Sequence, residues 1–152
     1  MKSKVRSLRG AGLLEVVVAS ALLALVFTGL FGVLQLGTRL ATDNKSRTGA
    51  LSLALERIEY IRSLDYSNIG TTGGVPSGPL AANESIALNG VDYVRRTYIV
   101  YIDDPKDGLG GGDTNGITTD YKRVKVEVSW EGQTGTRFSS LVSDFMPLGI
   151  EQ

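Results

Sequence analysis

The chain has 152 residues and no formal net charge, and it contains neither cysteine nor histidine. Those two absences exclude disulfides, thiolate zinc sites, and catalysis by a cysteine, a serine–histidine pair or an imidazole. The length allows one domain with one modest core. Beyond Gly10 the acidic side chains outnumber the basic ones, which argues against a nucleic-acid-binding surface. Arg95-Arg96 and Lys122-Arg123 are therefore predicted to be solvated strand positions.

The chain begins with a short basic segment. Lys2, Lys4, Arg6 and Arg9 all precede the first acidic residue, Glu15. An excess of basic residues before an apolar stretch favours a cytoplasmic N-terminus. We therefore expect the rest of the chain to lie on the outer side of the inner membrane.

An uncharged segment extends from Val16 to Thr38. As a helix it would be about 35 Å long, enough to cross a hydrocarbon core of about 30 Å with some tilt. Gly29, Gly32 and Gly37 weaken such a helix by about 1 kcal/mol each relative to alanine, and they also permit close helix approach. Small residues are common in membrane helices in any case. The segment predicts a single membrane span.

Glu15 lies directly before this segment, and the small residues Gly10, Ala11 and Gly12 precede it. A secretory signal places its small-residue cleavage site after the apolar stretch, so the order here is inverted. A charge inside a bilayer costs about 2.5–3.5 kcal/mol and normally implies a partner. Glu15 therefore either pairs with a neighbouring subunit or extends to the membrane surface as part of a simple signal anchor.

The residues from Arg9 to Val16, RGAGLLEV, resemble the cleavage motif of type IV prepilins, in which a basic leader ends in Gly shortly before a Glu. The resemblance implies that a membrane aspartyl peptidase cuts between Gly10 and Ala11 and also N-methylates Ala11. It further implies that Glu15 serves assembly by pairing with the N-terminal amine of a neighbouring subunit. Many family members have Phe at the first mature position, where this chain has Ala11.

Five segments are predicted along the chain. They are a cleaved basic leader (1–10), a transmembrane and assembly helix (11–38), an amphipathic continuation (39–66), a Gly/Pro-rich connection (67–83) and a domain of antiparallel strands (84–152). The helix is expected to run from Ala11 to Leu64. Helical spacing in its continuation predicts one apolar stripe that covers a sheet, formed by Leu51, Ala54, Leu55, Ile58, Ile61 and Leu64.

In the C-terminal domain the apolar period changes to two. Strands are predicted at 85–88, 91–103, 121–130 and 136–145, with turns at Asn89-Gly90 and 131–135. One face of the third strand is formed by Val124, Val126, Val128 and Trp130, and the other by Arg123, Lys125, Glu127 and Ser129. We predict an α+β fold with a long N-terminal helix packed on a four-stranded antiparallel sheet. The prepilin resemblance implies the same architecture.

A Gly-rich connection between the second and third strands contains several carboxylates. They are Asp103, Asp104, Asp107, Asp113 and Asp120. Such oxygen ligands suit calcium, and the resemblance adds that some pseudopilins carry a calcium loop late in the domain. The spacing is not that of an EF-hand, and solvated loops rich in Asp and Gly are ordinary. A calcium site and a plain loop both stay open.

The function predicted from these features is structural and not enzymatic. The resemblance implies a minor pilin or pseudopilin of a type IV pilus, type II secretion or DNA-uptake filament, inserted once in the inner membrane before assembly. Its partners would be other pilin subunits, a prepilin peptidase and methyltransferase, an inner-membrane assembly platform and the lipid bilayer. The alternatives are a membrane-anchored adhesin or ligand-binding module that displays loop 103–120, and an anchored enzyme, for which no residue constellation supports a reaction.

Overall fold

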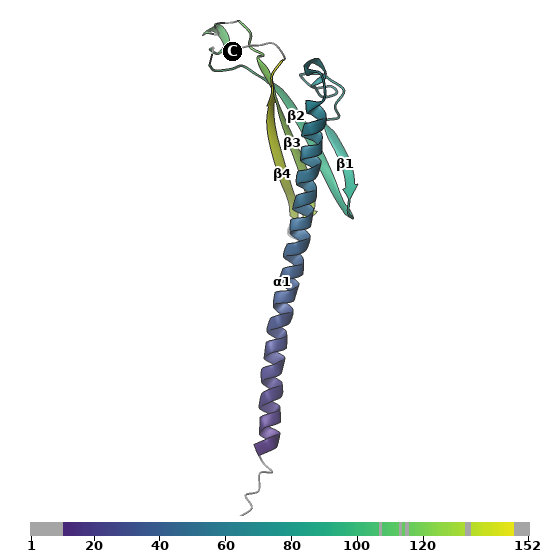
Figure 1. The fold of residues 1–152 in the computed structure, drawn as a ribbon, viewed down its shortest axis with the longest axis vertical. Helices are drawn as coiled ribbons and strands as arrows, with labels where there is room; N and C mark the ends of the chain where they lie inside the picture. The colour runs from purple at the N-terminus through teal and green to yellow at the C-terminus, as the bar shows by residue number, and fades with distance from the viewer. Residues whose placement is uncertain (1–10, 107, 113, 115, 133–134, 148–152) are drawn as a thin grey trace, which may run out of the picture. The chain divides into compact units, whose positions relative to one another are not determined.

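The computed structural model describes residues 11–106, 108–112, 114, 116–132 and 135–147. The chain divides into two compact units, Met1–Thr42 and Asp43–Gln152. In chain order the elements are α1 (Ala11–Arg62), η1 (Tyr66–Asn68), β1 (Asn83–Leu88), β2 (Val91–Ile102), η2 (Gly110–Gly112), β3 (Tyr121–Gly132) and β4 (Gly135–Phe145). The fold is α+β, with a long helix followed by a four-stranded antiparallel sheet, as predicted (Figure 1).

The helix α1 is continuous in its hydrogen bonding from Ala11 to Arg62 and ends two residues before the predicted position. No proline interrupts this stretch, so every turn can keep its backbone bonds. At its C-terminal end the N–H of Ser63 is shared between the carbonyls of Glu59 and Tyr60, at 3.1 Å each. Arg62 in the last turn also interacts favourably with the negative end of the helix dipole.

The strands pair in sequence order, β1-β2-β3-β4, and each neighbouring pair is antiparallel. Asn89 and Gly90 join β1 to β2 with φ angles of 53° and 79°, which confirms the predicted hairpin turn. The second turn is shorter than the predicted range 131–135. Pairing continues there as far as Gly132 with Gly135, because both strands extend by the residues expected to form the turn.

The core lies in the second unit, where the C-terminal part of α1 covers one face of the sheet (Figure 1). The predicted helical stripe is only partly correct, since Leu51 and Leu55 are 39% and 47% exposed whereas Leu53 is buried. The face that meets the sheet is centred on the small residues Ala50 and Ala54, which permit close approach and leave the bulkier leucines at its margin. The buried apolar residues are Ala50, Leu53, Ala54, Ile58, Ile61, Ile69, Leu80, Tyr93, Ile99, Val124, Val126, Val128 and Trp130.

Gly49 is a site of close approach between α1 and β2. The hydroxyl of Tyr93 donates a hydrogen bond to the carbonyl of Ser46 at 3.0 Å. A Cβ atom added to Gly49 would lie only 2.6 Å from that hydroxyl oxygen. Glycine is therefore needed here because the buried tyrosine occupies the space of a side chain.

We expect Gly49→Ala to lower the free energy of unfolding by about 1–3 kcal/mol, although alanine favours helix elsewhere. The added methyl group must displace the Tyr93 ring or break its bond to Ser46. Denaturant unfolding of the full chain in detergent measures the change. Thr48→Ala, at the neighbouring exposed position, is the control and should change stability by less than about 0.5 kcal/mol. A Gly49→Ala variant as stable as this control would contradict the close packing.

The predicted apolar face of β3 is confirmed, because Val124, Val126, Val128 and Trp130 are all buried. Ser129, expected on the solvated face, is buried as well. The prediction for the paired basic residues is wrong at two positions, since Arg95 and Lys122 are only 7% and 3% exposed. Both occupy the strand face that meets the core, and their long side chains reach polar partners at its margin.

Lys122 links the start of β3 to the segment that follows α1 through hydrogen bonds. Its Nζ donates to the carbonyls of Tyr66 and Ile69, at 2.7 and 2.8 Å, and lies 4.5 Å from the centre of the Tyr66 ring. Burial lowers the pKa of Lys122 from its ordinary value. The ammonium group thus supplies a donor to the Ile69 carbonyl and a second donor to the Tyr66 carbonyl, which also accepts from the N–H of Ile69.

A bidentate ion pair on the solvated face joins β3 to β4. Arg123 donates two hydrogen bonds of 2.7 Å to Asp144, and this bonding lowers the pKa of Asp144 from its ordinary value. Because the folded-state pKa is the lower one, the pair stabilises the fold above the unfolded-state pKa. Its contribution is lost as the pH falls through the folded-state value.

We therefore expect Asp144→Asn to flatten the dependence of the melting temperature on pH below about pH 4, where the wild type loses this pair. Melting curves from pH 2 to pH 7 provide the measurement. Asp92→Asn is the control, since Asp92 is exposed and has no ion pair within the described residues. Identical pH profiles for Asp144→Asn and the wild type would refute the contribution.

Candidate functional site

The predicted processing and assembly residues lie at the start of α1. Gly10 is outside the described residues, and Ala11 is the first residue of the helix. Glu15 lies in the second turn, where its side chain is exposed and has no hydrogen bond or ion pair within the described part of the chain. Glu15 is the only acidic residue from Ala11 to Thr42, and the residues that the structure describes offer it no partner.

Every side chain from Gly12 to Thr42 is exposed. The apolar ones include Leu13 and Phe31, and they occur on all sides of the helix. A helix that is apolar all round is stable only when lipid or other protein surrounds it. By length and composition α1 is able to cross a membrane, and none of its most apolar stretch is buried within the chain.

The hydroxyl groups within this apolar part are satisfied inside the helix. Ser20 donates to the carbonyl of Val17, and Thr28 donates to that of Ala24, at 2.9 and 2.8 Å. Such internal bonds remove the cost of placing a hydroxyl in an environment without water. Glu15 differs from them because no carbonyl can satisfy a carboxylate.

The aspartate loop uses its described carboxylates within the loop. Asp120 accepts a 2.7 Å bond from the N–H of Asp104, and Asp103 accepts a 3.0 Å bond from the N–H of Gly110. Asp107 and Asp113 lie outside the described residues. Among the residues that the structure describes, no three acidic side chains form a group able to hold a metal ion. The calcium site stays a prediction.

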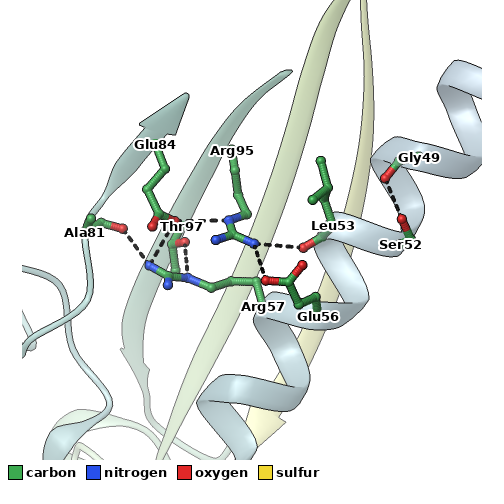
Figure 2. A network of polar contacts seen from close by, with 9 residues as sticks. All are labelled: Gly49, Ser52, Leu53, Glu56, Arg57, Ala81, Glu84, Arg95 and Thr97. Carbon is green, nitrogen blue, oxygen red and sulfur yellow. Dashed lines mark hydrogen bonds and ion pairs between the residues drawn. The ribbon is translucent and has the colours of Figure 1, made fainter. Parts of the chain in front are cut away.

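Two buried guanidinium groups, which the sequence did not reveal, converge on one carboxylate between α1 and the sheet (Figure 2). Glu84 of β1 accepts from Arg95 of β2 at 3.0 Å and lies 3.3 Å from Arg57 of α1. Arg57 also donates to Thr97 and to the carbonyl of Ala81. Three elements thereby meet in one polar cluster.

Arg95 completes the cluster through the helix backbone. It donates to the carbonyl of Leu53 at 3.2 Å and lies 3.6 Å from the carboxylate of Glu56 (Figure 2). Burial lowers the pKa of Arg57 from its ordinary value, an effect that Glu84 opposes and Arg95 reinforces. Arginine stays charged despite such a shift, so both cations must keep their acceptors. The cluster holds α1 in register on β1 and β2.

One sequence signal for Arg95 exists in retrospect. It occupies the same alternating face of β2 as Tyr93, Thr97 and Ile99, which are all buried. Arg57 carries no such signal, because a helix of mixed composition places charges beside its apolar stripe as readily as within it. Its burial depends on how far the sheet extends over the helix.

Comparison with known proteins adds no family to these observations. No family model, curated protein or solved structure matches the chain.

Proposed function

We propose that this protein is a structural subunit of the prepilin type, a minor pilin or pseudopilin that is cut after Gly10 and assembles through residues 11–38. One observation carries the proposal. An exposed, uncharged helical stretch follows directly on Glu15, and a basic leader that ends in Gly10 precedes it. A simple anchor requires the apolar stretch but neither the glycine nor the acid at this spacing.

Membrane insertion supplies the first environment for the exposed stretch. Its length of about 35 Å matches a bilayer with some tilt, and the basic leader favours the cytoplasmic side. The second unit, Asp43–Gln152, would then lie outside the inner membrane. The same apolar surface can later be covered by the helices of neighbouring subunits when the protein leaves the bilayer.

Cleavage would give Glu15 a specific role. It creates a free amine at Ala11, which a methyltransferase activity of the peptidase would modify. The carboxylate of Glu15 can pair with this cation on a neighbouring subunit inside an apolar bundle. Because an unpaired buried charge is costly, subunits out of register would be disfavoured. The implied partners are other pilin subunits, the peptidase and an inner-membrane assembly platform.

The decisive experiment is the intact mass of the full chain, extracted from membranes after co-expression with a prepilin peptidase. We expect a product that begins at Ala11, with or without one added methyl group. Gly10→Val should block this cleavage, whereas Gly12→Ala, two residues further on, should not. An uncut wild-type chain beside a control pilin that is cut would overturn the proposal and favour a signal-anchored binding module.

A further inference from the structure

A groove of about 640 Å³ lies at the end of the second unit where β3 and β4 join. Three α1 residues, Asp43, Asn44 and Arg47, form one wall. Trp130 and residues 136–140 of the β3–β4 hairpin form the other. We call this the hairpin groove. It combines an aromatic surface with serine and threonine hydroxyls and two guanidinium groups.

The hairpin groove has a cation without a partner. Asp43 forms an ion pair with Arg137, so one carboxylate and one guanidinium in the groove neutralise each other. Arg47 is exposed and has no hydrogen bond or ion pair within the described residues. The indole Nε1 of Trp130 is buried and also lacks an acceptor there. The groove therefore offers donors and one net positive charge, which suit a carboxylate.

An unpartnered carboxylate lies at the opposite end of the same unit. Asp65 precedes η1 but does not cap it, and its exposed side chain has no partner within the described residues. Lys122 at the start of β3 contacts the adjacent Tyr66, which places Asp65 beside the β2–β3 end of the sheet. Asp103, Asp104 and Asp120 add acidic groups to that end. The hairpin groove lies at the β3–β4 end, so Arg47 and Asp65 are at opposite ends of the sheet.

We propose that the hairpin groove receives the Asp65 end of a second copy of this chain, with the Asp65 carboxylate against the Arg47 guanidinium. The inference rests on the proposed function, in which all copies have the same orientation relative to one membrane. Two hairpin grooves of such copies cannot face each other. The groove of one copy can meet the Asp65 end of another when the copies are staggered along the assembly. A contact between two different surfaces can repeat from copy to copy without closing, as a filament requires.

Cysteine cross-linking tests the contact directly, because the chain contains no cysteine of its own. One tagged full-length copy would carry Asn44→Cys in the groove, and a differently tagged copy would carry Ser67→Cys beside Asp65. Co-expression in membranes with the peptidase and mild oxidation should give a disulfide-linked dimer of the two tags. Two tagged copies that both carry Asn44→Cys should give none, because grooves do not face each other.

Charge reversal then tests the pairing itself. In the copy that carries Asn44→Cys, the further change Arg47→Glu should reduce cross-linking roughly five-fold, because it replaces an attraction between exposed charges by a repulsion. Asp65→Arg in the other copy should restore it. Lys45→Glu is the matched control, since this exposed lysine is on the same helix but does not line the groove. The proposal would be overturned if Asp65→Arg did not restore cross-linking, or if Lys45→Glu reduced cross-linking as much as Arg47→Glu.

The same samples distinguish a failure of this contact from a failure of the proposed function. A chain that is cut after Gly10 but gives no cross-link between groove and Asp65 end would refute this contact and leave the proposed function standing. A chain that is not cut at all would refute the proposed function, and the contact with it.

Discussion

Arg95→Met is expected to lower the free energy of unfolding by roughly 1.5–3 kcal/mol, the usual contribution of hydrogen bonds made by a charged group. The substitution keeps the length of the side chain but leaves Glu84 with Arg57 alone and removes the side-chain donor from the carbonyl of Leu53. A domain of this size has about 5–15 kcal/mol of stability in total. The expected loss is therefore a substantial fraction of the total stability.

Denaturant titration of the full chain in detergent, followed by tryptophan fluorescence, measures this change. The single tryptophan, Trp130, is 5% exposed and reports on the core of the second unit. Arg96→Met is the matched control, because the neighbouring side chain is exposed and lies 3.8 Å from Glu127 on the opposite face of the sheet. A loss in Arg95→Met no larger than in Arg96→Met would contradict a structural role for the cluster.

Replacing Arg57, Glu84 and Arg95 together by methionine should cost less than the sum of the three single substitutions. Each single change leaves a buried charge or carbonyl without its partner, whereas the triple change removes all three charges at once. The difference between the triple variant and the summed singles, measured by the same titration, reports the coupling. Strict additivity would mean that the three side chains stabilise the fold independently.

Glu15→Ala is expected to insert and to be cut after Gly10 but to enter filaments at least roughly ten-fold less than the wild type. Insertion and cleavage depend on the apolar stretch and the leader, which the substitution leaves intact. Assembly would lose the carboxylate that pairs with the amine of Ala11 on a neighbouring subunit, and an unpaired buried cation costs several kcal/mol. The ratio of filament-bound to membrane-bound protein, from quantitative blotting, measures the effect.

Two variants separate charge from helix packing. Glu15→Asp keeps the negative charge and should recover part of the assembly, whereas Glu15→Gln keeps the shape and should not. Gln35→Ala removes another exposed polar side chain of the same helical stretch and should assemble normally. Normal filament incorporation of Glu15→Ala would exclude the pairing role and leave Glu15 as an interfacial residue of an anchor.

The sequence by itself determined the class of the long helix and of the four strands. The uncharged stretch from Val16 to Thr38 predicts a helix because no proline or charge interrupts it, and the alternation from Val124 to Trp130 predicts a strand with one buried face. The turn at Asn89-Gly90 is equally local, since few other residues adopt positive φ at both positions. These patterns depend only on residues close together in the sequence, so they can be predicted without the tertiary structure.

Only the tertiary structure decided where the polar groups lie. Arg57, Arg95 and Lys122 are buried although charge normally signals exposure, because carbonyls and carboxylates from distant segments surround them. The pairing of Glu84 with residues 57 and 95 joins three elements, so no local pattern predicts it. The hairpin groove likewise arises where α1 and the β3–β4 hairpin approach each other, more than eighty residues apart in the sequence. Long-range contacts of this kind follow from packing, which residue spacing does not encode.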